Sequence, residues 1–212
     1  MNKIAAAVLI TILSVAAAFS QGFDVKAKGN QTFSFKDDQG RNQATFHSVT
    51  PLDEVDGLST DISGMVSFNV EHVDSTLQGE ITITTQSLKT GIKMRDKDLK
   101  ESKWLDAETY PKISYKIKKV TKVEKIAPNK LKVDVIGDFT LHGKTNEVPV
   151  EATMTYLDQN EQTLQREPGD LLGITAKFSI TLSKYGVQNM VLGSRVSDHI
   201  DIGVNIVGTN KF

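Results

Sequence analysis

The sequence of 212 residues contains no cysteine, so disulfides cannot stabilise it and no lipid anchor can be attached to a cysteine near its start. Stability must therefore come from side-chain packing and from the hydrogen bonds of a sheet. The chain also lacks an excess of either charge, because its formal net charge is −1 and both signs are mixed along it. A basic surface for nucleic acid or for anionic lipid headgroups is therefore excluded.

Long apolar runs are scarce, and the one that is present lies at the start, from Ile4 to Ala18. It follows a positively charged residue, ends in small residues, and is shorter than the roughly 20 residues that a transmembrane helix needs. This pattern predicts a secretory signal over residues 1–20, with cleavage after Ser20, or alternatively after Ala18. We expect residues 21–212 to form a single domain in the periplasm or outside the cell, without an integral membrane segment.

Most of the remaining chain alternates apolar and polar residues with a period of two. Lys, Glu, Asp, Ser and Thr occupy the polar phase, so each segment buries one face only, as the strands of an antiparallel sheet do. About nine such segments are separated by turn signals, of which Asp56-Gly57 is one. A sheet of this many strands removes its exposed edges by closing on itself. We therefore predict an all-β fold, an antiparallel closed β-barrel of about eight to nine strands.

The segment from Thr90 to Tyr115 leaves this rhythm. Its apolar residues, among them Leu99 and Trp104, are spaced for a short helix, and Asp96 is placed to cap that helix. Tyr110-Pro111 ends the helical part, after which alternation resumes. We expect a short helical insert that caps one end of the barrel.

Several short motifs follow one another in a recognisable order between about residues 62 and 207. They are Thr90-Gly91, Arg95-Asp96, Leu99, Leu105-Asp106, Tyr110-Pro111, Ile113 and Tyr115, then the stretches 137–145, 185–187 and 196–202. Agreement of several motifs is far more specific than any one alone. In these features the chain resembles the YceI-like family of periplasmic lipid-binding proteins. The resemblance implies a lipocalin-like barrel that binds a polyisoprenoid or another lipid, with Arg95 and Asp96 beside its polar end.

The apolar phase of the strands supplies either a filled core or the wall of a cavity. Small residues on that phase, Gly137, Ala152 and Ala176, leave space along one side, although small residues opposite large ones also fill ordinary barrels. The side chains that we expect to line the interior and contact an apolar ligand are Phe35, Phe46, Phe68, Ile83, Tyr115, Val135, Phe139, Ala152, Met154, Ala176, Phe178 and Val204. Burial of a lipid tail at about 0.8 kcal/mol per CH₂ supplies affinity without any headgroup contact.

Two other functions fit the same pattern. A filled barrel without ligand would suit a structural or stress-response protein of the cell envelope with surface partners. An outer-membrane barrel would turn the apolar phase outward, and Phe212 at the end of the chain favours this alternative. An aromatic content of 7% with a single Trp opposes it, because membrane barrels carry aromatic girdles at both interfaces.

Motifs for catalysis or metal binding are missing from the sequence. The four histidines, His47, His72, His142 and His199, are scattered without the spacing of a metal site. Gly143-Lys144-Thr145 lacks the spacing of a phosphate-binding loop. We therefore expect a binding protein rather than an enzyme, with no metal site and no cofactor beyond a bound isoprenoid or other lipid. Its expected partner is a hydrophobic small molecule, and its expected state is a monomer or weak homodimer.

Overall fold

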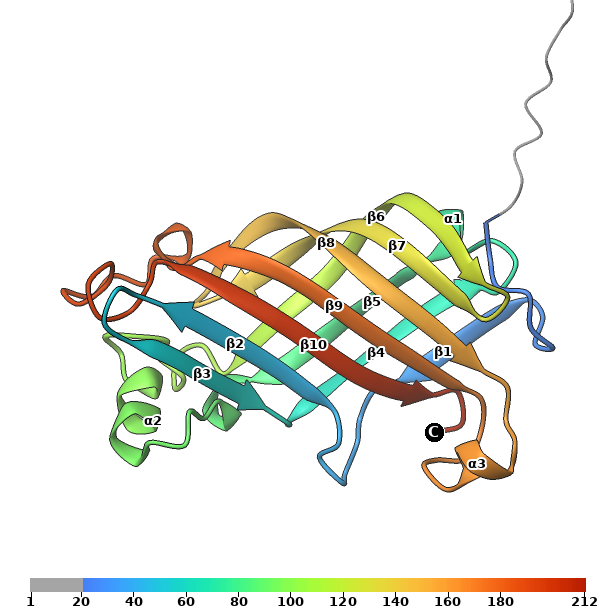
Figure 1. The fold of residues 1–212 in the computed structure, drawn as a ribbon, viewed down its shortest axis with the longest axis horizontal. Helices are drawn as coiled ribbons and strands as arrows, with labels where there is room; N and C mark the ends of the chain where they lie inside the picture. The colour runs from blue at the N-terminus through green and yellow to red at the C-terminus, as the bar shows by residue number, and fades with distance from the viewer. Residues whose placement is uncertain (1–20) are drawn as a thin grey trace, which may run out of the picture.

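A computed structural model describes residues 21–212, which form a ten-stranded antiparallel sheet closed into a barrel (Figure 1). The signal predicted for residues 1–20 lies outside the described residues. The barrel strands, in spatial order, are β1 (Asn30–Ser34), β4 (Ile62–Asn69), β5 (Gln78–Thr84), β6 (Lys112–Ala127), β7 (Lys130–Leu141), β8 (Lys144–Leu157), β9 (Leu171–Thr181) and β10 (His199–Thr209). Ser34 pairs with Thr209, so β10 meets β1 and closes the ring of eight strands. The predicted antiparallel closed barrel is confirmed.

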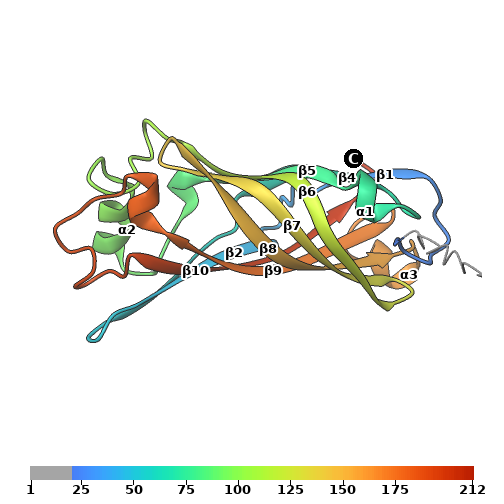
Figure 2. The same cartoon turned by 90° about the horizontal axis from the view of Figure 1, so that it is seen from above.

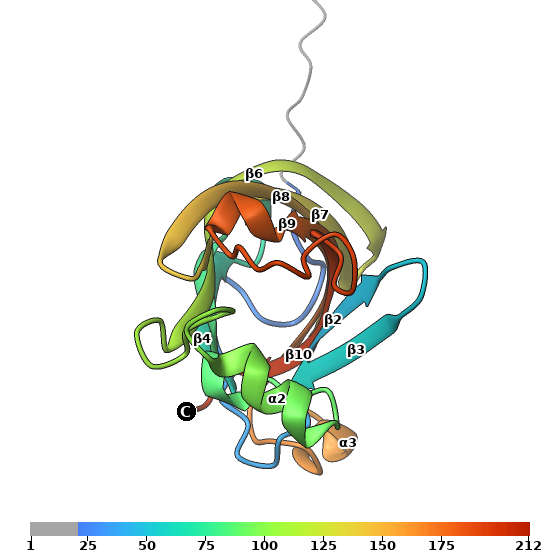
Figure 3. The same cartoon turned by 90° about the vertical axis from the view of Figure 1, so that its left-hand side faces the viewer.

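The other two strands form a hairpin that leaves the barrel wall. Strand β2 (Gln43–Val49) pairs with the first half of β10, and β3 (Glu54–Ser59) pairs with β2. Backbone hydrogen bonds between Leu58 and Lys89 tie the base of the hairpin to the segment that follows β5. Figure 3 shows the hairpin flaring away from the ring. Its free end therefore borders one mouth of the barrel.

Helical segments lie at the two ends of the barrel. They are α1 (Val73–Thr76), α2 (Lys93–Lys100) and α3 (Glu161–Leu164), with 3-10 turns at Thr85–Ser87 and Leu182–Tyr185. Figure 2 shows α2 and α3 at opposite ends, so α2 is the helical insert that the sequence predicted. The predicted capping role of Asp96 is wrong, because α2 follows Ile92 and has no side-chain cap. Asp96 instead lies in the first turn, where its carboxylate accepts two hydrogen bonds from Thr90.

The end of the barrel away from α2 is filled by aromatic side chains. Phe33 and Phe68 stack with their ring centroids 5.8 Å apart, Phe23 packs against Phe68, and Tyr156 packs against Phe33 and Phe23. All four residues are buried. The hydroxyl of Tyr156 donates to Asp170 at 2.7 Å, which satisfies the polar atom of this cluster. We call these four side chains the aromatic floor.

The apolar phase of the strands faces the barrel interior, and the polar phase faces outward. Lysine–carboxylate pairs lie on the outer surface, with Lys118 2.9 Å from Glu147 and Lys132 2.8 Å from Glu151. An outer-membrane barrel carries the opposite arrangement, with an apolar band outside. Among residues 21–212, no helix is long and apolar enough to cross a membrane.

Candidate functional site

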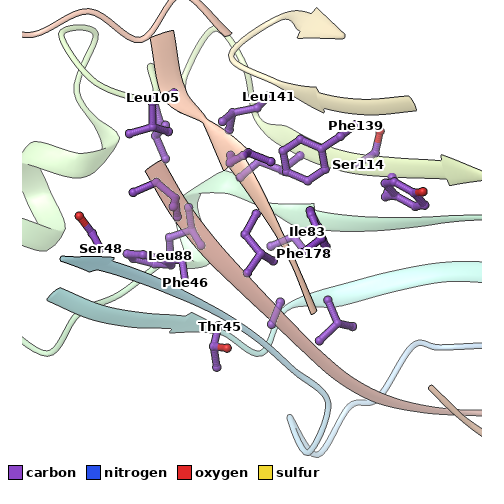
Figure 4. Close-up of a pocket in the computed structure, with 18 of the residues that line it drawn as sticks. Thr45, Phe46, Ser48, Ile83, Leu88, Leu105, Ser114, Phe139, Leu141 and Phe178 are labelled. Atoms are coloured by element: carbon purple, nitrogen blue, oxygen red, sulfur yellow. The ribbon is translucent and has the colours of Figure 1, made fainter. Parts of the chain in front are cut away.

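The barrel interior contains a cavity of about 990 Å³ that extends to the end beside α2. Its wall combines side chains of the barrel strands and of β2 with residues of α2 and of the loop before β10. The volume is at the upper end of the roughly 300–1,000 Å³ range of small-molecule sites. Figure 4 shows Phe46, Ile83 and Phe178, from three different strands, directed toward the same space. The part of the interior beside α2 is thus a cavity, whereas the aromatic floor fills the other end.

Most of the side chains that the alternation assigned to the interior lie on the cavity wall. These are Phe46, Ile83, Tyr115, Val135, Phe139, Ala152, Met154, Ala176, Phe178 and Val204. Phe35 and Phe68 point inward but lie away from this wall. Phe68 belongs to the aromatic floor, and Phe35, fully buried, packs closely against Gly208. Alternation predicts which face of the sheet a side chain occupies, but it does not predict how deep along the barrel axis that side chain lies.

A row of small side chains keeps the middle of the cavity open. Ala152 pairs with Val133 on one side and with Ala176 on the other, and Ala176 pairs in turn with Val204. Ala44 of β2 continues the row beyond Val204. All five side chains line the cavity. The space expected beside Ala152 and Ala176 is present because the other members of the row, Val133, Val204 and Ala44, also have small side chains.

Gly137 behaves differently from the alanines. A Cβ added there would lie 2.5 Å from Cζ of Tyr115, so the phenol ring already occupies the space above this glycine. The Tyr115 hydroxyl donates to the carbonyl of Val148 at 3.0 Å, and burial raises the pKa of the phenol. Tyr115 therefore contributes a neutral, hydrogen-bonded aromatic surface to the wall, and Gly137 accommodates it.

Aromatic rings continue from Tyr115 along the wall toward α2. The ring of Phe178 lies 6.0 Å from that of Tyr115 and 5.6 Å from that of Phe139, and Phe139 is 5.6 Å from Tyr185. Such contacts fix ring orientation by edge-to-face packing. Among the described residues, no histidine lies on the cavity wall, and the deep part of the wall is apolar. This surface suits contact with hydrocarbon.

Charged and polar groups gather at the mouth. Arg95, Asp98 and Lys103 come from α2 and the loop after it, Arg195 comes from the loop before β10, and Asp53 comes from the β2–β3 turn. The mouth is therefore the part of the cavity where a polar group of a ligand would meet charged side chains.

A short hydrogen-bonded chain holds Arg95 at the mouth. Its Nε donates to Oγ1 of Thr90 at 2.9 Å, and that hydroxyl donates to the carboxylate of Asp96 at 2.6 Å. The hydrogen bond from the Thr90 hydroxyl lowers the pKa of Asp96, so the carboxylate stays ionised near neutral pH. Arg95 lies on the wall while Asp96 lies behind it, acting through Thr90.

The cavity also includes residues that sequence reasoning did not assign to it. Ala44, Ile113 and Ile202 share the apolar phase of their strands, so the alternation itself contained the signal. Ile92, which precedes α2, and Met190, in the loop before β10, lie at the mouth and are exposed. Neither belongs to an alternating strand, so no periodic pattern marks them.

Relatives of this chain are somewhat more than a quarter identical to it over the aligned residues. It is 29% identical to a UPF0312 protein of Pseudomonas fluorescens over 154 residues, which cover 73% of this chain and 74% of that protein. It is 28% identical to a UPF0312 protein of Vibrio parahaemolyticus over 158 residues, covering 74% and 75% of the two chains.

Solved structures share the fold. BcnA of Burkholderia cenocepacia superposes with a TM-score of 0.63 at 20% identity, covering 82% of this chain and all of BcnA. A polyisoprenoid-binding domain of Saccharophagus degradans gives a TM-score of 0.59 at 12% identity, covering 87% of this chain and 99% of that domain. The family model of the YceI-like domain matches residues 27–208. Given this match over most of the barrel, the chain belongs to the YceI-like family.

Proposed function

We propose that this protein is an exported carrier or store of one long apolar molecule, such as a polyisoprenoid, a quinone or a fatty acyl derivative. The observation that carries this proposal is the apolar cavity of about 990 Å³, which has an aromatic floor behind it and charged residues at its mouth. The polyisoprenoid-binding domain among the structural neighbours supports the same ligand class.

Energetics favour an apolar occupant. Side chains that face an empty apolar space lose the dispersion contacts they would make in a packed interior, and a hydrocarbon chain restores them. At roughly 0.8 kcal/mol per buried CH₂, one five-carbon isoprene unit contributes about 4 kcal/mol. Two or three such units exceed the usual cost of association, so tail burial alone supplies useful affinity.

Arg95 is the proposed contact for the polar end of the ligand. A guanidinium matches a phosphate, carboxylate or carbonyl group through fixed N–H donors. Asp96 positions this side chain through Thr90 rather than touching the ligand itself. The tail would then extend past Phe178 and Ala152 toward the aromatic floor.

The proposed location is the periplasm or the space outside the cell. Residues 1–20 have the composition of a secretory signal, and membership of the YceI-like family agrees with an envelope location. We propose that the exported chain acts as a monomer or weak homodimer.

Solvent extraction followed by mass spectrometry tests the function directly. Protein purified without detergent from an envelope fraction is expected to yield about one lipid per chain, and delipidated protein is expected to bind prenyl and acyl probes. If no lipid co-purifies and neither probe binds, the cavity is not a lipid site. The alternative of a structural or stress-response envelope protein would then be favoured.

A further inference from the structure

The antiparallel register brings three potential metal ligands together on the outer face of the β2–β3 hairpin. His47 on β2 pairs directly with Asp56 on β3, and Glu54, two residues before Asp56, lies on the same face of β3. The His47 Nδ1 atom lies 2.8 Å from Oδ1 of Asp56, and Nε2 lies 3.5 Å from Oε1 of Glu54. One ligand atom from each residue lies within 4.8 Å of the others. The two carboxylates contact opposite nitrogens of the ring, so an ion bound at Nδ1 beside Asp56 requires the exposed Glu54 side chain to turn toward it.

Strand β10 adds two further groups beside this cluster. Asp201 pairs with His47 across the β10–β2 ladder, and His199 Nε2 lies 3.3 Å from Oδ1 of Asp201. Ser179 donates a hydrogen bond to the same carboxylate at 2.6 Å. Two imidazoles that are far apart in the sequence therefore share one patch of the outer sheet, together with three carboxylates.

The charge balance of this patch differs from that of the remaining outer surface. Elsewhere on the barrel, several carboxylates pair with lysines, as Glu147 does with Lys118 and Glu151 with Lys132. Within residues 21–212, the ion pairs of Glu54, Asp56 and Asp201 are made to histidines alone. Three carboxylates therefore lie together with no lysine or arginine of the described chain paired to them, and a bound metal ion would compensate their negative charge.

We propose that His47, Glu54 and Asp56 bind a divalent transition-metal ion, with zinc as the ion that best fits them. Imidazole nitrogen and carboxylate oxygen are both ligand types that zinc accepts, and three such ligands leave one position of a tetrahedral ion for water. The carboxylates are exposed, so water has free access. Asp201 pairs with His47 across the strands and adds negative charge beside it, which favours a cation there.

The position of the site links it to the cavity. Phe46 and Val55, which neighbour the ligands along β2 and β3, line the inner side of the same hairpin. A bound ion would join the two strands from outside and hold the hairpin against spreading at the mouth. This inference does not depend on the identity of the lipid.

Zinc titration of the delipidated full chain, by calorimetry and by thermal unfolding, tests the proposal. We expect one zinc ion per chain and a rise in Tm with zinc concentration, because the ion binds the folded state. His47→Gln and Glu54→Gln are each expected to lower the affinity about tenfold or more. His72→Gln, at the other end of the barrel, is the matched control and is expected to bind zinc as the wild type does.

Two results would overturn the proposal. One is the absence of stoichiometric zinc binding by the folded wild-type chain. The other is equal zinc affinity in wild type and His47→Gln, which would indicate general attraction to carboxylates. Because Glu54 is exposed, Glu54→Gln keeps the test valid even if the histidine variant folds poorly.

Discussion

Replacement of Ala152 by tryptophan should close the cavity at its middle. Ala152 lies between Val133 and Ala176 in the row of small side chains, with its methyl group directed into the cavity. An indole at this position projects toward the barrel axis and occupies space that a hydrocarbon chain would fill. The backbone conformation is that of an ordinary strand, so the fold itself is expected to survive.

The expected loss of affinity follows from the ligand groups that the indole displaces. The indole ring adds roughly nine heavy atoms. If each atom displaces one CH₂ of the ligand at about 0.8 kcal/mol, the loss of binding free energy is at most about 7 kcal/mol. If only three groups are displaced, the loss is about 2.4 kcal/mol. Even this smaller loss weakens binding roughly 50-fold.

Titration of delipidated protein with a fluorescent acyl or prenyl probe measures this effect, and circular dichroism with thermal unfolding shows whether the variant is folded. Thr153→Trp is the matched control, because it places the same indole on the opposite face of β8, outside the cavity. We expect wild-type affinity from the control and at least a 50-fold loss from Ala152→Trp. A folded Ala152→Trp variant with wild-type affinity would show that the ligand does not pass this point.

Three further predictions concern other parts of the barrel. Arg95→Ala should weaken binding of fatty acids or prenyl phosphates more than that of bare hydrocarbons, and calorimetry showing equal weakening would contradict a headgroup contact. Gly137→Ala should destabilise the fold by about 1–3 kcal/mol because the new Cβ meets the Tyr115 ring and the carbonyl oxygen of Lys116, and in denaturant titrations of the double variant Tyr115→Leu should relieve only the part of this loss that is due to the ring. Burial alone would raise the pKa of Asp37, but hydrogen bonds from Arg41 and from backbone amides lower it to about 2. Because the pKa of Asp37 is lower in the folded than in the unfolded state, the ionised carboxylate stabilises the folded state by about 2 kcal/mol above pH ~4. This stabilisation is lost as the pH falls toward 2. The stability difference between wild type and Asp37→Asn should shrink accordingly, and a difference that stays constant down to pH 2 would refute the assignment.

Alternation of apolar and polar residues was sufficient to predict the barrel and the inward direction of its side chains. Tyr115, Phe139 and Phe178 occupy three strands, and each reaches the cavity because its strand phase points inward. The helical insert was also recognisable, since Leu99 and Trp104 leave the two-residue rhythm. These features depend on local periodicity, which a single sequence displays.

Features that depend on register or depth could not be predicted in this way. Phe68 has the same phase as Phe178, yet it packs into the aromatic floor because its position along the axis depends on how β4 aligns with β1. His47 and His199 meet on one patch because β2 pairs with β10, a contact between strands far apart in the chain. Met190 reaches the mouth from a loop, where no periodic signal exists.

The aromatic floor gives the cavity a direction. With Phe23, Phe33, Phe68 and Tyr156 filling one end, the tail of the proposed lipid would enter first, from the end beside α2. A molecule with a polar group at each end would have to bury one of them against these rings, so selection should favour amphiphiles with one bare terminus. The distance from the mouth to the floor would then limit the length of the tail that can be buried.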